Sequence, residues 1–241
     1  MATSTELKRA PSEMRSAAHG ASMSGWKRGL DLVLIAMALP FLIPVFVVIA
    51  LIIKLLSKGP IFFKQERIGY LGNPFLLLKF RTMKVNACTQ GHQGHLATLM
   101  HSDAPMTKLD NIGDPRLIVF GRVLRSSGLD ELPQLINVLR GEMSLVGPRP
   151  CMRYEFDRYE QWQKQRFNAF PGLTGLWQVS GKNKTTFHQM IELDIHYASN
   201  MSLRFDLKIM LKTFPVLLGQ VREMSARAAK RKTTQTAPGK H

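Results

Sequence analysis

The sequence of 241 residues contains few cysteines and few acidic residues. Its two cysteines, Cys88 and Cys151, cannot form the set of disulfides that holds a small secreted domain together, which indicates a reducing compartment. Asp and Glu number 17 against 33 Lys and Arg, so the formal net charge is +16. Such an excess predicts anionic partners: nucleic acid, an acidic membrane surface or phosphorylated substrates. Because 45% of the residues are apolar, wholesale disorder is excluded.

One stretch, residues 32–53, lacks charged side chains altogether. As a continuous helix it would be about 33 Å long, close to the roughly 30 Å of a bilayer's hydrocarbon core. Pro40 and Pro44 lie at its middle, where each removes a backbone donor and bends or breaks a helix. We therefore predict a membrane-associated helix at 25–57, with its break at Pro40 and Pro44.

Basic residues flank this segment on both sides. Lys27 and Arg28 precede it, and Lys54, Lys58 and Lys64 follow it. Because positive charge favours the cytoplasmic side of a membrane, both ends are expected there, as in a re-entrant helical hairpin. A kinked helix that crosses the membrane is the alternative. A signal peptide is not favoured, since the apolar run is long and no small-residue cleavage site follows it.

The rest of the chain divides by composition. Residues 1–24 are polar and rich in Ser and Ala, which predicts a flexible leader. Residues 222–241 carry six Lys or Arg against one Glu, which predicts a disordered basic tail. Residues 58–221 remain as one soluble body.

This body begins with a predicted β-hairpin. Runs that favour strands, at 61–63 and 75–80, flank a turn at 69–74. A loop region follows at 86–115. Within it, four side chains are of zinc-ligand type: Cys88, His92, His95 and His101. Their spacing matches no paired-ligand template, so structural zinc is the less favoured interpretation.

Residues 121–150 carry the most informative pattern. Four apolar residues recur at helical spacing: Leu132, Leu135, Ile136 and Leu139. With Asp130 as the N-cap, Pro133 falls in the first turn, where its missing N–H is tolerated. Asp130 and Glu131 are therefore expected at a helix N-terminus. Carboxylates at that position stabilise the helix, so position alone requires no catalytic explanation.

Arginines change that interpretation. Four lie near the two carboxylates in the sequence: Arg122, Arg125, Arg140 and Arg149. Guanidinium groups bind phosphate oxygens two at a time, so acids and arginines together indicate phosphoryl chemistry with a divalent metal.

An apolar stripe at helical spacing lies near the C-terminus: Leu207, Met210, Leu211, Phe214, Leu217 and Leu218. Arg204, Lys208 and Lys212 occupy the other side. Such a stripe is usually part of a core. Beside a membrane segment, a basic amphipathic helix can instead lie in the interface, where anionic lipids hold it.

Several strings in a fixed order resemble the bacterial sugar transferases, the monotopic polyprenyl-phosphate hexose-1-phosphate transferases of the exopolysaccharide-production type. They are KFRTM at 79–83, DPR at 114–116, LDELPQLINVLRGEMSLVGPRP at 129–150, PGLTGLWQVSGKN at 171–183 and D-x-x-Y at 194–197. The resemblance covers about 26–221. The expected fold is α+β and mostly helical: a re-entrant membrane helix hairpin, a cytoplasmic catalytic domain at 58–221 with a small β-hairpin, and interfacial amphipathic helices.

The resemblance implies a two-step phosphoglycosyl transfer on the cytoplasmic face of the bacterial inner membrane. Asp130 would attack a UDP-hexose, with galactose or glucose expected, and undecaprenyl phosphate would then take the phosphosugar. This step starts exopolysaccharide or O-antigen repeat units. Glu131 would hold Mg²⁺ together with Asp130, or position the acceptor.

The resemblance also assigns the basic residues. Arg125 and Arg149 would contact phosphate, and Lys79 with Arg81 would neutralise the diphosphate. Lys182 stands where similar enzymes often have arginine, and a nucleotide contact is the implied role. Two other departures are Ile43 before Pro44, where a serine is usual, and Gly128, which replaces a common serine.

A function without chemistry is the alternative: a membrane-attached scaffold or basic binding protein of a polysaccharide assembly system. No nucleic acid is expected, because the sequence carries no helix-turn-helix, paired-knuckle or RNA-recognition signature. The sequence leaves open whether the protein forms a homo-oligomer.

Overall fold

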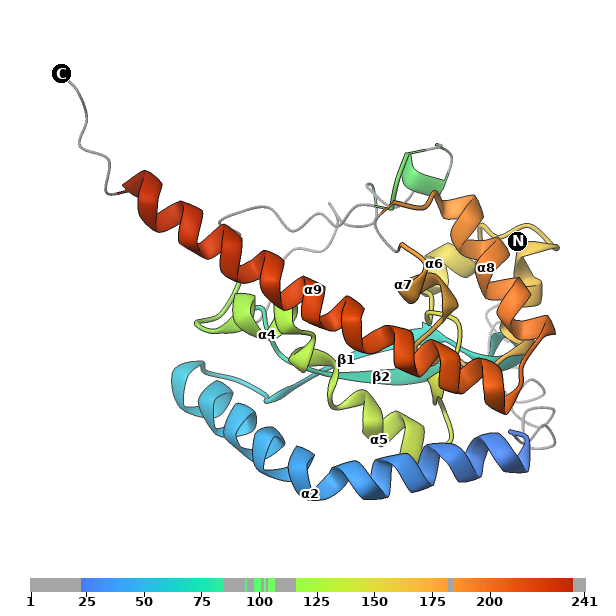
Figure 1. The fold of residues 1–241 in the computed structure, drawn as a ribbon, viewed down its shortest axis with the longest axis horizontal. Coiled ribbons are helices and arrows are strands. Elements are labelled where there is room, and N and C mark those ends of the chain that lie inside the picture. Colours follow the sequence, from blue (N-terminus) through green and yellow to red (C-terminus); the bar gives the residue numbers. More distant parts are fainter. Residues whose placement is uncertain are drawn as a thin grey trace, which may run out of the picture.

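The computed structural model describes residues 23–84, 94, 98–100, 102, 104–106, 116–181 and 184–235, with side chains of the last helix to residue 219. These residues form mostly helices, as expected, together with two small sheets, of which only the hairpin was predicted (Figure 1). The elements in order are α2 Gly25–Leu56, β1 Phe62–Ile68, η2 Tyr70–Gly72, β2 Pro74–Phe80, α4 Gly121–Ser127, η3 Leu129–Glu131, α5 Gln134–Leu139, β3 Ser144–Val146, α6 Arg153–Phe156, η4 Gln163–Asn168, β4 Gly172–Thr174, α7 Leu176–Val179, α8 Phe187–Ser199 and α9 Leu203–Gln235.

Helix α2 runs along one edge of the molecule and bends near its middle (Figure 1). Pro40 and Pro44 lie inside it, and the helix continues through both. Among the described residues, it is the one helix long and apolar enough to cross a membrane. Its middle turns expose large apolar side chains, with Phe41 at 78%. Because this surface is not covered by the protein, α2 differs from the core helix of a water-soluble domain.

The N-terminal end of α2 is fixed by a buried polar cluster. Lys27 Nζ lies 2.5 Å from Asp206 Oδ2 and donates to the Tyr197 hydroxyl at 2.8 Å. The same hydroxyl is 2.7 Å from Asp206 Oδ1. All three side chains are at most 2% exposed, and they join α2, α8 and α9. Beside them, Arg28 donates to two backbone carbonyls at the end of α5.

The C-terminal end of α2 is fixed by an apolar cluster instead. Ile49 and Ile53 pack with Phe80 of β2 and with Ile118 and Leu124 at the two sides of the α4 start. Both ends of α2 therefore contact the same folded body, on either side of the bend.

The predicted β-hairpin is confirmed. β1 and β2 pair antiparallel, with Phe62 opposite Phe80 and Ile68 opposite Pro74. The turn between them contains the short helix η2, in the predicted turn region.

Helix α5 packs on this hairpin through a polar residue. Asn137 is fully buried; its Nδ2 donates to Leu76 O at 2.7 Å and its Oδ1 accepts from Leu78 N at 3.0 Å. The apolar face predicted for this helix is wrong in detail, since Leu139 is exposed while Asn137 and Val138 are buried. The helix is oriented by the hydrogen bonds of Asn137 to two backbone groups of β2, and the spacing of apolar residues cannot predict such bonds.

Strands β3 and β4 pair in parallel, and the crossover between them contains α6 and η4. Two backbones meet beside this pair. A Cβ atom on Gly147 would lie 2.1 Å from Phe170 O, and one on Gly172 would lie 2.0 Å from Gly147 N. Glycine is therefore required on both sides of the contact, which explains one glycine in each of the strings GPRP and PGLTG.

Helix α9 runs diagonally across the view toward the upper left and continues to Gln235 (Figure 1). The segment at 222–235, expected to be disordered, is thus helical; its Ala, Lys and Arg residues favour helix, and its Pro and Gly come later, at 238 and 239. Within the apolar stripe, Leu211 and Phe214 are 70% and 67% exposed. The stripe is therefore largely outside the core, and the basic side chains beside it are exposed as well.

We predict that Lys27→Met lowers the free energy of unfolding by about 3–5 kcal/mol, because Asp206 would remain as a buried, uncompensated carboxylate. Thermal and denaturant unfolding of the detergent-solubilised protein measure this loss. The matched control is the double variant Lys27→Met/Asp206→Leu, which removes both charges and is expected to recover most of the stability. Equal losses in the two variants would contradict the pairing.

Candidate active site

Asp130 lies in η3, the single 3₁₀ turn between α4 and α5, and is 9% exposed. The expectation that it is the N-cap of a longer helix is wrong, because α5 begins only at Gln134. Pro133 has no N–H, and the amides of Leu135 and Ile136 bond to carbonyls three residues back. These bonds have the three-residue spacing of a 3₁₀ helix, so the four-residue hydrogen bonds of an α-helix do not begin at Asp130.

Gly128 sets the direction of this turn. Its φ of 74° lies in the left-handed region, which glycine adopts without the cost of about 1–2 kcal/mol that a Cβ would add. The glycine that replaces the common serine therefore suits the backbone that leads into Asp130.

Glu131 is brought to strand β2. Its Oε1 accepts from Lys79 Nζ at 2.7 Å, and the two side chains are 42% and 25% exposed. A partly exposed pair of this kind contributes only about 0–1 kcal/mol to stability. Its consequence is geometric: a cation on β2 and the carboxylate beside Asp130 are held together at the surface. The structure thus unites three of the predicted site residues, Lys79, Asp130 and Glu131.

Arg81, two residues beyond Lys79, has a different environment. It is 4% exposed, and its guanidinium donates to Lys58 O at 2.6 Å and to Ser57 O at 2.9 Å. These carbonyls follow the last turn of α2. Arg81 therefore fixes the end of α2, and both of its terminal nitrogens donate to these carbonyls.

Arg149 lies in a mostly buried ionic cluster. Its Nη1 is 3.1 Å from Glu155 Oε2, and Arg67 approaches the other oxygen at 3.9 Å. Burial alone would raise the pKa of Glu155, but Arg149, Arg67 and Arg166, together with the bond from the Met152 amide, hold this pKa below its ordinary value. The Arg149 side chain is still 24% exposed, so part of it faces solvent.

A second arginine fixes the turn that carries Arg149. Arg166 is fully buried, forms an ion pair with Asp194 and donates to Arg149 O at 2.8 Å. This explains the D-x-x-Y string on α8: Asp194 holds Arg166, and Tyr197 holds Lys27 of α2. Sequence reasoning found the string but assigned neither contact.

The remaining candidates are less defined. Arg125 is half-buried in the last turn of α4, shortly before Asp130. Lys182 and the zinc-type residues Cys88, His92, His95 and His101 lie outside the described residues. Within the described part of the chain, no group of three or more His, Cys, Asp or Glu residues could hold a metal ion.

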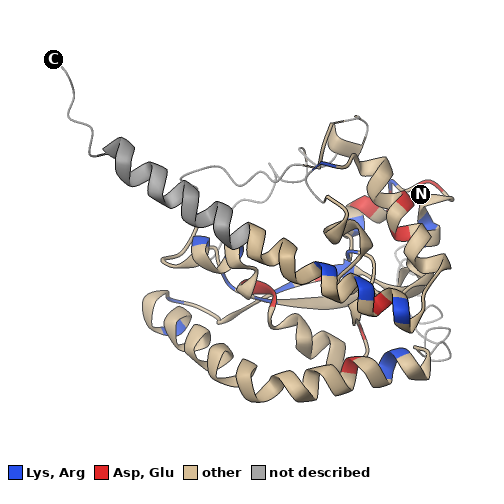
Figure 2. Ribbon diagram, in the orientation of Figure 1, with Lys and Arg blue, Asp and Glu red and all other residues tan. Residues whose placement is uncertain are grey.

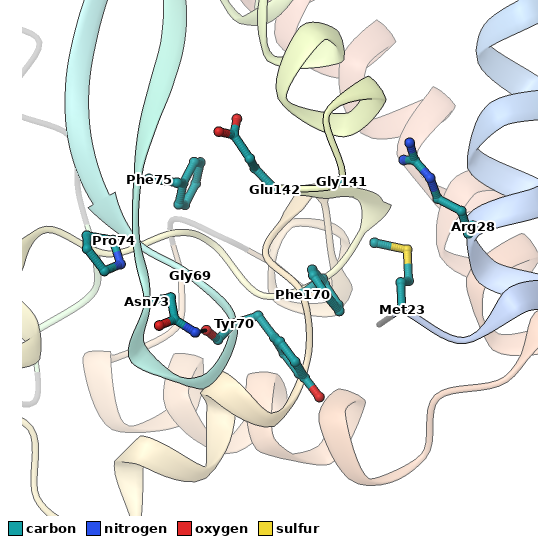
Figure 3. A pocket seen from close by; sticks show the side chains of 10 residues that line it. All are labelled: Met23, Arg28, Gly69, Tyr70, Asn73, Pro74, Phe75, Gly141, Glu142 and Phe170. Atoms are coloured by element: carbon teal, nitrogen blue, oxygen red, sulfur yellow. Dashed lines mark hydrogen bonds between the residues drawn. The ribbon is translucent and has the colours of Figure 1, made fainter. Parts of the chain in front are cut away.

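A cavity of about 440 Å³ lies elsewhere, near the N-terminal end of α2 (Figure 3). The Tyr70 and Phe170 rings stack at its edge, 4.1 Å apart. Its charged groups already bond within the protein, Arg28 to backbone carbonyls and Glu142 to Asn137. None of the predicted site residues lines it, so the hollow is separate from the Asp130 site.

Comparison with known proteins decides the family. A sequence model described as bacterial sugar transferase matches residues 22–220. The chain belongs to the bacterial sugar transferase family. The predicted resemblance is thereby confirmed, as is the expectation of a transferase enzyme.

Characterised relatives differ in length from this transferase. It is 40% identical to the exopolysaccharide production protein ExoY of Sinorhizobium fredii, over 79% of this chain and 84% of the relative. It is 43% identical to the UDP-glucose:undecaprenyl-phosphate glucose-1-phosphate transferase of Caulobacter vibrioides, over 80% and 69%. It is 41% identical to the undecaprenyl-phosphate galactose phosphotransferase of Salmonella typhimurium, over 66% of this chain but 34% of that longer protein.

The place of Arg81 leads to a prediction for this transferase. Arg81→Lys should lower the free energy of unfolding by about 2 kcal/mol, because a single ammonium cannot reproduce the two bonds that end α2. The Michaelis constant of the folded enzyme for its sugar donor should stay unchanged. Lys79→Met is the matched control: it should change stability by less than about 1 kcal/mol and impair turnover. If Arg81→Lys has normal stability but a raised Michaelis constant for the sugar donor, Arg81 contacts the substrate as the sequence predicted.

Proposed function

We propose that this transferase moves a hexose-1-phosphate from a UDP-hexose to undecaprenyl phosphate and so initiates exopolysaccharide or O-antigen repeat units. The observation that carries the proposal is the pair Asp130–Glu131, held beside Lys79 of β2, two residues before the arginine that binds the carbonyls at the end of α2. The names of the relatives support the substrates, and they include both glucose and galactose. Galactose or glucose is therefore the proposed sugar.

In the proposed first step, a carboxylate oxygen of Asp130 attacks the phosphorus that carries the sugar. The bond from that phosphorus to the oxygen bridging the two phosphates breaks, and UMP leaves with the electron pair. In the second step, a phosphate oxygen of undecaprenyl phosphate attacks the same phosphorus and releases the Asp130 carboxylate. A covalent intermediate divides one difficult displacement into two easier ones.

The basic residues have distinct proposed tasks. Lys79 holds Glu131 in place and adds positive charge beside the nucleophile. Arg125 and the solvent-facing part of Arg149 are proposed to contact the diphosphate, because a guanidinium matches phosphate oxygens in pairs. The buried Arg166 positions Arg149 by donating a hydrogen bond to the Arg149 backbone carbonyl. Lys182 is proposed to contact the nucleotide.

Mg²⁺ is the proposed cofactor. Two adjacent carboxylates fit this ion, which in proteins is usually held by one or two carboxylates together with substrate phosphates. Asp130 and Glu131 would hold it, and when bound it would neutralise charge on the transferring phosphoryl group.

We propose that α2 enters and leaves the cytoplasmic leaflet of the inner membrane. Its two ends contact one folded body, through Lys27 at the start and Ile53 near the end, and it bends between them (Figure 1). A helix that crossed the bilayer would separate its ends by roughly 30 Å of hydrocarbon, with one end on each side. Anionic lipids are the expected partners of the flanking basic residues.

Asp130→Asn should abolish turnover, lowering UMP release by about 10³-fold or more, because an amide cannot form the acyl phosphate. The assay contains the purified enzyme, undecaprenyl phosphate, Mg²⁺ and a panel of UDP-sugars. Asp157→Asn is the matched control, since Asp157 is an exposed carboxylate whose described ion pair is with Arg153.

After incubation with UDP-sugar but no acceptor, intact-mass analysis should show a phosphohexose adduct on the wild type and on Asp157→Asn, and none on Asp130→Asn. An adduct on Asp130→Asn would remove Asp130 from the nucleophilic role. If the wild type turns over no sugar in the panel, the protein is better explained as a non-catalytic scaffold.

The membrane topology is tested by cysteine labelling in a Cys88→Ser background. Trp26→Cys and Lys58→Cys place a thiol at each end of α2. With an impermeant maleimide, neither should react in intact spheroplasts and both should react after permeabilisation. A reaction of either position in intact spheroplasts would instead establish a helix that crosses the membrane.

A further inference from the structure

A buried amide side chain ties the helix that follows the acid pair to the strand that carries Lys79. Helix α5 contains no charged residue, and Figure 2 shows it without a basic or acidic position. It packs through Val138 in one apolar cluster with Ile35 of α2 and Leu77 of β2. Because apolar contacts are not directional, they do not by themselves fix where the helix lies along the strand.

Asn137 supplies the directional contact. Its fully buried carboxamide donates to Leu76 O at 2.7 Å and accepts from Leu78 N at 3.0 Å. Residues two apart on a strand present their backbone groups to the same edge, so one carboxamide, with a donor and an acceptor, can bond both. A shift of α5 along β2 by one residue would break both bonds. The side chain therefore fixes one register of the helix on the strand.

Glu142 fixes the orientation of this carboxamide. Asn137 Nδ2 also donates to Glu142 Oε2 at 2.6 Å, and the Glu142 amide donates to Asn137 O at 3.0 Å. A carboxamide turned by half a rotation would place its oxygen against the Glu142 carboxylate and Leu76 O, which are both acceptors. The hydrogen bonds of Asn137 therefore fit a single orientation of its side chain.

Asn137 and Glu131 together join one segment of the chain to β2 at two points. Lys79 directly follows Leu78 on the strand, and its ammonium binds Glu131 at 2.7 Å. Glu131 ends η3, which leads through a short turn into α5 and Asn137. Because the two points are close along both the strand and the η3–α5 segment, a shift at Asn137 changes the contact between Lys79 and Glu131.

We propose that Asn137 is a positioning residue for the transfer reaction. By fixing α5 on β2, it sets where the Glu131 carboxylate meets Lys79, and so where the neighbouring Asp130 lies relative to the phosphorus of the sugar donor. A misplacement of about 1 Å can lower a rate about 100-fold although every catalytic group is present. The inference rests on the proposed function, because it takes Asp130 to be the nucleophile.

The test measures how fast the phosphohexose adduct forms without acceptor, per folded molecule of the full-length, detergent-solubilised enzyme. Asn137→Asp keeps the acceptor for Leu78 N, loses the two donated bonds and faces Glu142 with a second carboxylate. The adduct should form about 10- to 100-fold more slowly. The UDP-sugar concentration that gives half the maximal rate should change by less than about twofold, because no proposed diphosphate contact lies on α5. Val138→Ala is the matched control: it leaves a cavity at the next buried position of the same helix, so it should lower stability and keep the rate.

A double-mutant cycle with Lys79→Met separates positioning from a structural role. If Asn137 acts through the contact of Lys79 with Glu131, Asn137→Asp should slow adduct formation by less than about threefold once Lys79 is replaced. Equal slowing in both backgrounds would overturn the inference, and so would an unchanged rate of Asn137→Asp alone. In either case a wild type that forms the adduct leaves the proposed function intact. A wild type that forms no adduct with any UDP-sugar overturns the proposed function and this inference with it.

The reversed pair Asn137→Asp/Glu142→Gln supplies the test if the single variant does not fold. The amide introduced at position 142 can donate to the carboxylate introduced at position 137, which restores that bond and removes the repulsion. The acceptor for Leu78 N is kept as well. This variant is expected to fold and to form the adduct within about tenfold of the wild-type rate. A folded reversed pair that is slower than this overturns the inference.

Discussion

The fixed position of α2 on the catalytic body is the constraint on which the rest of the structure depends. At its start, a lysine ion pair is sealed between three helices, and near its end, isoleucines pack against β2 and the start of α4. A buried pair of this kind is costly to break although it adds little net stability, so its effect is to select one geometry. The apolar helix is therefore attached at both ends to the rest of the described fold.

The end of strand β2 and the residue after it connect α2 to the acid pair. Arg81 binds the carbonyls that follow α2, and Lys79 binds Glu131. Two basic residues of one string, KFRTM, thus have different tasks: the first belongs to the site and the second to the helix that supports it. Their separation by one residue along an extended backbone keeps the acid pair at a defined distance from the end of α2.

The sequence allowed the local features to be predicted, and the long-range ones only in part. The hairpin and the apolar helix follow from side-chain patterns, and the neighbourhood of Asp130 follows from the strings around it. The N-cap at Asp130 was predicted wrongly because Pro133 and Gly128 together select a 3₁₀ turn. The buried pairs of Lys27 with Asp206 and of Arg166 with Asp194 join residues far apart in the chain, and no local pattern specifies such partners.

The contact between Gly147 and Gly172 has a consequence for how such enzymes can change over time. Each position excludes a side chain because the other backbone is already in van der Waals contact with it. Crowding in a core is commonly relieved when a neighbouring residue is replaced by a smaller one, but glycine has no side chain that could be shortened. No compensatory substitution at one of these positions can rescue the other, so drift in this part of the chain is confined to the residues around the two glycines.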